Sequence, residues 1–208
     1  MREMQSFPES GDQPRDKVSA ELEAWLASDH PKTLGNLIGL FDEKSFALVF
    51  MLLMAVPALP LPTGGATHVL EVITVLVALQ LVVGRQEIWL PDRWKGIELA
   101  GPRRERLLQG LLKLIRFFER FSKPRLTWLL DPKLGRSVFG LVVIALTVAA
   151  FVAPPFSGLD TLPSLGVVVL SLGVLLEDFV VALIGVAIGV AGVALEVVLG
   201  KAVLSLFE

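Results

Sequence analysis

The sequence predicts an all-helical, polytopic integral membrane protein, and three observations lead to that fold class. Of the 208 residues, 53% are hydrophobic and 19% are charged, whereas an average soluble domain has about 45–50% apolar and about 25% charged residues. The apolar excess is concentrated, because residues 45–84 contain one formal charge, Glu71, and residues 137–208 contain six. Both stretches are also interrupted by prolines. Helices this apolar are expected to lie in a bilayer.

Charge divides the chain into four regions. Residues 1–44 form a polar, amphipathic N-terminal arm with more acidic than basic residues, and residues 45–84 form the first hydrophobic half. Residues 85–136 form a connector that holds thirteen of the 19 Lys and Arg residues, and residues 137–208 form the second hydrophobic half. Basic residues favour the cytoplasmic side of a membrane. We therefore expect the arm and the connector to be cytoplasmic.

Composition excludes several classes of function. The chain has no cysteine and two histidines, which rules out disulfides, thiolate nucleophiles and Cys-based metal sites. The net charge of −2 shows no bias toward nucleic acid. Phosphate-binding, dinucleotide-binding and hydrolase motifs are absent from the sequence. We expect no metal, no cofactor and no enzymatic activity; an intramembrane enzyme acting on a lipid-linked substrate is the alternative.

The first hydrophobic half begins with a short helix. The apolar run over residues 46–56 has eleven residues, about 16 Å of helix, whereas a span needs about 20 residues. This helix ends at a break, where prolines remove backbone donors and glycine permits the chain to reverse direction. Residues 66–83 then form a second helix. The residues that define the break are Pro57, Pro60, Pro62 and Gly64.

The second hydrophobic half repeats this plan. An apolar run over residues 138–152 leads to a break and to a further run over residues 164–176, and residues 179–199 are long enough to span alone. The break is marked by Pro154, Pro155 and Pro163. Paired, proline-interrupted short segments indicate an inverted repeat with re-entrant helices. Alternatively, the prolines mark ordinary loops between complete spans.

The connector contains a basic amphipathic helix over residues 102–126. Leucine, isoleucine and phenylalanine form one stripe, and Arg and Lys fill the opposite side. This pattern is typical of helices that lie in the membrane interface and bind anionic lipids; packing on the rest of the protein is the alternative. Trp89 and Trp94 precede it and are expected to anchor the chain at headgroup level, with substrate stacking as the second interpretation.

Six polar residues in or beside the apolar segments form a candidate polar pathway, since ionisable groups in a membrane usually face a cavity or a partner. They are His68, Glu71, Gln80, Arg85, Glu177 and Asp178. His68 and Glu71 lie on one face of a helix. They form a proton-linked or cation-coordinating pair, or they lie hydrated at a helix end. Glu177 and Asp178 form a solvated turn or the polar end of a discontinuous helix, where Arg85 is a natural partner.

Small residues recur in the last segment. Gly185 and Gly189 form a GxxxG pattern, which lets helices approach closely. The pattern favours packing within the chain, and a homodimer is the alternative.

These segments resemble one family of bacterial membrane proteins. The run TLGNLIGLFDEKSFALVFMLLMAVPALPLPTGG, followed by ALQLVVGRQEIWLP, and the later run PPFSGLDTLPSLGVVVLSLGVLLEDFVVALIG are similar to the ExoD family. Where that pattern has Asp-Gly, this chain has Asp178-Phe179. The resemblance implies a multi-pass inner-membrane protein linked to exopolysaccharide synthesis, without an agreed catalytic site or substrate.

Two functions follow from this interpretation. The first is transport or handling of a lipid- or envelope-derived solute for exopolysaccharide production. The second is a non-catalytic scaffold that assembles polysaccharide-synthesis proteins. A polar path through the membrane would favour the first, and scattered, solvated polar residues would favour the second. The lipid bilayer is a partner in both.

Overall fold

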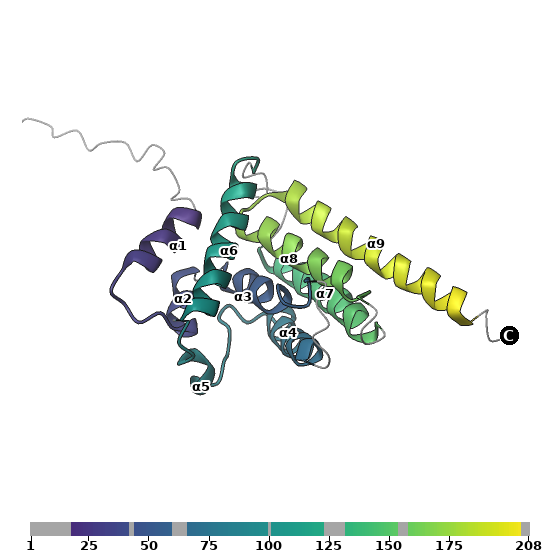
Figure 1. Ribbon diagram of the computed structural model, residues 1–208, viewed down its shortest axis with the longest axis horizontal. Coiled ribbons are helices and arrows are strands. Elements are labelled where there is room, and N and C mark those ends of the chain that lie inside the picture. The colour runs from purple at the N-terminus through teal and green to yellow at the C-terminus, as the bar shows by residue number, and fades with distance from the viewer. Residues whose placement is uncertain are drawn as a thin grey trace, which may run out of the picture.

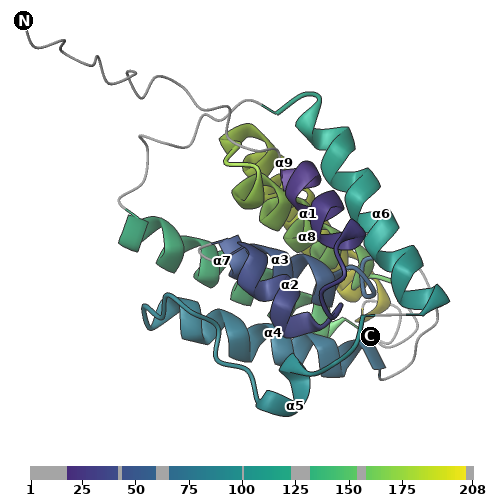
Figure 2. The ribbon, with the colours of Figure 1, turned by 90° about the vertical axis from the view of Figure 1, so that its left-hand side faces the viewer.

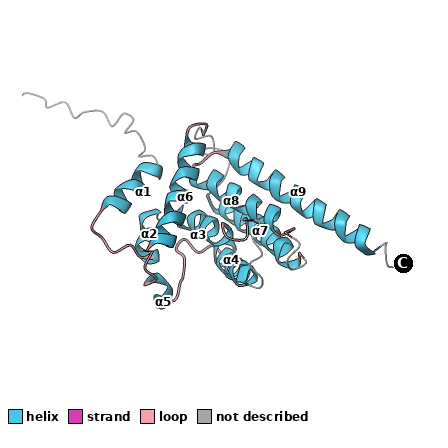
Figure 3. Ribbon diagram, viewed as in Figure 1, coloured by secondary structure: helices cyan, strands magenta, loops and turns pink. Residues whose placement is uncertain are grey.

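The computed structural model describes residues 18–41, 44–59, 66–99, 101–122, 132–153 and 158–204, which form helices without a β-strand (Figures 1 and 3). The helices are α1 (Val18–Ala27), α2 (Leu34–Phe41), α3 (Ser45–Met54), α4 (Ala66–Val82), α5 (Asp92–Lys95), α6 (Pro102–Glu119), α7 (Pro132–Val152), α8 (Thr161–Leu175) and α9 (Phe179–Leu204). An isolated β-bridge pairs Thr33 with Glu98. The all-helical prediction is confirmed for this part of the chain.

Two of these helices are long and apolar enough to cross a membrane. They are residues 135–152 of α7 and residues 179–202 of α9. The apolar helices α3, α4 and α8 are shorter, with 10, 17 and 15 residues. Their boundaries fall within a few residues of the predicted ones, because apolar runs and proline breaks are local signals.

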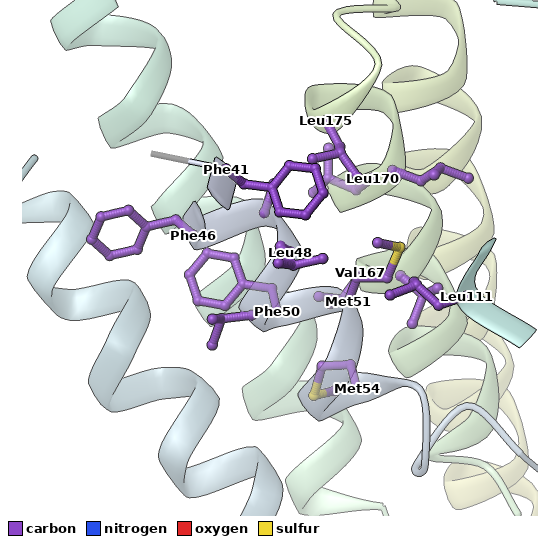
Figure 4. Close-up of a cluster of buried hydrophobic side chains, with 14 of the residues drawn as sticks. Phe41, Phe46, Leu48, Phe50, Met51, Met54, Leu111, Val167, Leu170 and Leu175 are labelled. Carbon is purple, nitrogen blue, oxygen red and sulfur yellow. The ribbon is translucent and has the colours of Figure 1, made fainter. Parts of the chain in front are cut away.

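Helix α3 lies at the centre of the molecule. Eight of its ten residues are buried, as expected for a helix that is hydrophobic all round. It packs against α2, α4 and α8. Figure 4 shows its side chains gathered with those of α8 and with Leu111 of α6 in one buried cluster. The ring of Phe50 also meets Phe139 of α7 edge-on, at 5.5 Å between centroids.

The two hydrophobic halves pack reciprocally. The first helix of each half contacts the second helix of the other, so α3 packs on α8 and α4 packs on α7. The rings of His68 and Phe151 are 5.0 Å apart, which places the start of α4 beside the end of α7. Lys44 and Glu177 form an ion pair at 3.0 Å, which places the start of α3 beside the end of α8. The segments that follow α3 and α7 therefore leave from the same end of the bundle.

Helices α8 and α9 form a close antiparallel hairpin through small residues. A β-carbon at Gly185 would lie 2.2 Å from the backbone nitrogen of Leu170, and one at Gly173 would lie 2.3 Å from that of Ala182. Gly166 meets Gly189 in the same way. The GxxxG pattern is thus used for packing within the chain. Figure 1 shows α9 extending past α7 and α8, away from α1, α5 and α6.

The N-terminal arm and the connector pack together at the other end of the molecule. Figure 2 shows α1 beside α6. Glu119 accepts hydrogen bonds from the backbone N–H of Ser19 (2.9 Å) and from its hydroxyl (2.5 Å). Arg116 pairs with Glu23. These contacts join residues that are about a hundred positions apart in the sequence.

Much of the apolar stripe of α6 packs on the protein and not on a membrane. Four of its residues are at most 9% exposed: Leu108, Leu111, Leu112 and Ile115. This stripe therefore fits the second interpretation of the sequence, in which the helix packs on the rest of the protein. A different edge remains open at the end of α6, where Phe117 is 57% exposed and Phe121, in the turn after the helix, is 70% exposed. Those two rings contact each other at 5.5 Å.

The prolines of the two breaks have different positions. Pro57 is buried in the turns that follow α3, and Ala55 still donates to the carbonyl of Met51 there. Pro163 lies inside the first turn of α8, where a backbone donor is not needed. It therefore belongs to the helix and does not interrupt it, contrary to the prediction. The remaining break residues lie outside the described part of the chain: Pro60, Pro62, Gly64, Pro154 and Pro155.

Candidate functional site

His68 and Glu71 lie in the first two turns of α4, at the end of the bundle where the breaks begin. Nδ1 of His68 is 2.8 Å from Oε2 of Glu71. The Glu71 side chain is 0% exposed, whereas that of His68 is 29% exposed. Glu71 is therefore not at a hydrated helix end, and His68 keeps contact with the outside.

Glu71 belongs to a buried polar face of α4. Thr67 precedes it by one turn and Thr74 follows it by one turn, and both side chains are buried. The hydroxyl of Thr74 donates to the carbonyl of Leu70 at 2.8 Å. Further along the same face, Ala78 and Leu81 are buried and apolar. Only the half of α4 nearest the break thus brings polar groups into the interior.

Other buried polar groups come from the second hydrophobic half. The hydroxyls of Thr147 on α7 and of Ser164 and Ser171 on α8 are buried without a hydrogen-bond partner in the described part of the chain. Oε1 of Glu71 is also buried without one. Unpartnered buried polar atoms are few in folded proteins and often mark functional sites.

Two carboxyl groups outside the predicted set belong to the same end of the bundle. Asp160, just before α8, interacts electrostatically with Glu71 of α4 and with Glu196 of α9. Oε1 of Glu196 is buried, and no described residue forms a hydrogen bond with it. Sequence reasoning missed Asp160 because it follows a break and resembles a loop residue. The sequence signal for Asp160 was its position three residues before Pro163, which places it at the start of a helix.

An apolar crevice lies beside Glu71, between α4 and α7. Its volume is about 170 Å³. Apart from Glu71, its walls are aliphatic and aromatic side chains: Val72, Val75, Leu76, Val148 and Phe151.

Gln80 lies at the opposite end of α4 and holds the start of the connector. Its Oε1 accepts a hydrogen bond from the backbone N–H of Trp89 (2.8 Å), and its Nε2 donates to the Trp89 carbonyl (3.2 Å). The Trp89 side chain is 62% exposed, as an interface anchor would be. Trp94 is partly buried and packs against the core. Arg85 is exposed at the end of α4.

The ends of α4 and α8 have the same local geometry. After α4, Gly84 has φ +90°, and the N–H of Arg85 donates to the carbonyl of Gln80. After α8, Glu177 has φ 56°, and the N–H of Asp178 donates to the carbonyl of Gly173. Both are Schellman turns. In the second one the left-handed residue is Glu177, so no glycine is needed at position 179.

Glu177 and Asp178 have structural partners. Glu177 pairs with Lys44. Asp178 is 2% exposed, and its Oδ1 accepts from the N–H groups of Val180 (2.9 Å) and Val181 (3.5 Å). Asp178 is thus the N-cap of α9.

The six predicted residues therefore divide between two ends of the bundle. His68 and Glu71 lie at the end of the breaks, and the other four lie at the connector end. They do not line one common cavity among the described residues. The same part of the chain contains no group of three or more His, Asp or Glu residues arranged to hold a metal ion.

Over the described residues, fold and site together define an all-helical protein with two helices of membrane-spanning length and a buried polar face on α4. Comparison with known proteins identifies the family. The chain belongs to the ExoD family, described as exopolysaccharide synthesis, ExoD, whose model matches residues 18–198.

Two relatives are similar to this chain. Protein ExoD of Rhizobium meliloti (strain 1021) is 29% identical over 175 residues, which cover 82% of this chain and 71% of that protein. A protein of Synechocystis, named Uncharacterized protein slr1875, is 27% identical over 165 residues, covering 78% and 77%. No solved structure matches this chain.

Proposed function

We propose that this chain is a multi-pass inner-membrane protein that transports or handles a lipid- or envelope-derived solute during exopolysaccharide synthesis, without catalysing a reaction. Family membership supports the link to exopolysaccharide. The observation that carries the transport role is the buried polar face of α4, with Glu71 at 0% exposure. An ionisable residue inside an apolar bundle is costly and usually serves a passing ion or solute.

The outer surface of the bundle supports the membrane location. Large apolar side chains are exposed on α4, α7 and α9 rather than packed, among them Val69, Leu76, Leu141, Val152, Leu183 and Val198. An exposed apolar surface of this extent is typical of contact with lipid. The crevice beside Glu71 opens among these side chains, and its apolar walls suit an acyl or isoprenoid chain.

Internal duplication is part of the proposal. The reciprocal packing of α3 on α8 and α4 on α7 is the arrangement that a pseudo-twofold axis would produce. The matching turns at Gly84 and Glu177 support the same correspondence. Helix α3, with 10 residues, is about 15 Å long and is proposed to re-enter the membrane without spanning it.

The open edge of α6 is proposed to bind anionic lipids. Phe117 and Phe121 are exposed there. Lys113 on α6 and Arg120 just after it are also exposed. Aromatic rings beside basic side chains suit the headgroup region. In Figure 1, α6 runs across one end of the bundle, the orientation that a helix lying along the surface would need.

Topology is tested by cysteine labelling, because the chain has no native cysteine. We expect Gly110→Cys, on the connector, to be protected from a membrane-impermeant reagent in intact spheroplasts. Leu59→Cys is the control and should be labelled. Leu59 is 49% exposed and follows α3, at the end of the bundle that we place on the non-cytoplasmic side. Labelling at position 110 without permeabilisation would reverse the proposed orientation.

The function is tested by deleting the gene in its native host. We expect the deletion to reduce secreted exopolysaccharide and wild-type protein to restore it. Glu71→Ala should fail to restore it although the protein is inserted, whereas Glu87→Ala, at an exposed position in the connector, should succeed. Normal exopolysaccharide in the deletion strain would contradict the proposal.

A second function is favoured by one observation. The candidate polar residues lie at two ends of the bundle rather than along one path, which suits a scaffold for polysaccharide-synthesis proteins. In that case Glu71→Ala would restore exopolysaccharide fully, and substitutions on the exposed edge of α6 would not.

A further inference from the structure

Glu71 occupies a place that disfavours an ionised carboxylate. Its side chain is 0% exposed, and Oε1 has no hydrogen-bond partner among the described residues. A buried carboxylate is stable only when both oxygens are well hydrogen-bonded or paired with a cation. A protonated carboxyl has a smaller requirement, since its O–H needs one acceptor. Nδ1 of His68, 2.8 Å from Oε2, is such an acceptor.

Of the neighbouring ionisable groups, Asp160 acts in the same direction, whereas a protonated His68 would favour the ionised carboxyl. Asp160, at the start of α8, interacts electrostatically with Glu71 and with Glu196 of α9. A like charge nearby opposes ionisation of a second carboxyl. Among the described residues, the ion-pairing partner of Glu71 is His68, on its own helix.

His68 connects this buried group to the outside. Its ring is 29% exposed, and its edge rests against Phe151 of α7 at 5.0 Å. One ring nitrogen, Nδ1, faces Glu71. An imidazole can accept a proton at one nitrogen and release another from the second.

We propose that Glu71 holds a proton at neutral pH and exchanges it with external water through His68. The carboxyl proton passes from Oε2 to Nδ1, and the proton on Nε2 leaves to water. Reprotonation follows the reverse path, so the pair gains or loses one proton in total. The inference rests on the proposed transport function, in which the proton held by Glu71 is the coupling ion. The protonation itself is measurable without any transported solute.

Infrared spectroscopy of the full chain tests this directly. The protein is purified in a maltoside detergent, which contains no carbonyl group to overlap the signal. We expect a carbonyl stretch of a protonated carboxyl group at neutral pH, which shifts in D₂O and declines as the pH is raised. Glu71→Gln should lose the part of this band that comes from Glu71, whereas any part from Glu196, whose Oε1 is also buried, should remain. Glu87→Gln, exposed at the opposite end of the bundle, should keep it.

Two further variants test the role of His68 and replace Glu71→Gln if that variant does not purify. His68→Leu should retain the band and slow its shift after transfer to D₂O, because the route to water is removed. If Glu71→Gln does not purify intact, Glu71→Asp should move the band instead of removing it. Identical protonated-carboxyl bands in wild type, Glu71→Gln and Glu71→Asp would overturn the proposal. Unchanged exchange in His68→Leu would overturn the role of His68. Neither result depends on whether deletion of the gene affects exopolysaccharide.

Discussion

Replacing Gly185 by alanine is expected to disrupt the α8–α9 hairpin. The added β-carbon would lie 2.2 Å from the backbone nitrogen and 2.6 Å from the α-carbon of Leu170. Backbone atoms cannot rotate away as the end of a side chain can, so the two helices must separate. Overpacking in a close-packed interior costs about 1–3 kcal/mol and sometimes more. We expect a loss of stability at or above that range, measured as thermal unfolding of the detergent-solubilised protein.

Gly200 provides the matched control, because the same change is made on the same helix. Apart from the adjoining backbone of α9 itself, no atom of the described residues lies within 4 Å of a β-carbon at Gly200. Alanine within a helix is favoured over glycine by about 0.5–1 kcal/mol, so Gly200→Ala should raise the unfolding temperature slightly. Equal unfolding temperatures for the two variants would show that α8 and α9 do not approach closely at Gly185.

Replacing Asp178 by alanine is the second substitution with a large expected effect. Asp178 is 2% exposed and accepts hydrogen bonds from the second and third residues of α9. Removing an N-cap costs about 0.5–2 kcal/mol, and burial of the freed N–H groups adds to that cost. We therefore expect Asp178→Ala to lose about 1–2 kcal/mol of unfolding free energy.

Asparagine at the same position separates the cap from the charge. Asn caps helices about as well as Asp and keeps the accepting oxygen. Asp178→Asn should therefore retain most of the stability that Asp178→Ala loses. If both variants were destabilised equally, the charge of Asp178 would matter more than its cap, and a role in the predicted polar pathway would regain support.

The helices were largely predictable because their signals are local. Apolar runs bounded by prolines and glycines placed α3, α4, α8 and α9 close to their actual boundaries. The pairing of His68 with Glu71 was predictable for the same reason, since three residues along a helix bring two side chains to one face. Pro163 was misplaced, because a proline in the first turn of a helix and a proline in a loop look alike in the sequence.

Other features of the site depend on residues far apart in the chain. The close approach of α8 and α9 uses glycines in both helices, so neither pattern alone revealed the partner. The residues Glu71, Asp160 and Glu196, which interact electrostatically, come from α4, from the residue before α8 and from α9. The left-handed conformation of Glu177 is held by the turn between α8 and α9, against the usual preference of its residue type.

Composition and local pattern were sufficient for the helical class, for the order of apolar and basic regions and for the family resemblance. They did not determine whether each polar or apolar face of a helix is buried or exposed. The stripe of α6 had the pattern of a membrane-bound helix, yet Leu111 and Ile115 are buried in the protein, because α1 and the bundle offer apolar surface nearby. Glu71 had the pattern of a hydrated helix end, yet it is fully buried. Burial depends on which surfaces meet after folding, and the packing of distant helices sets those contacts.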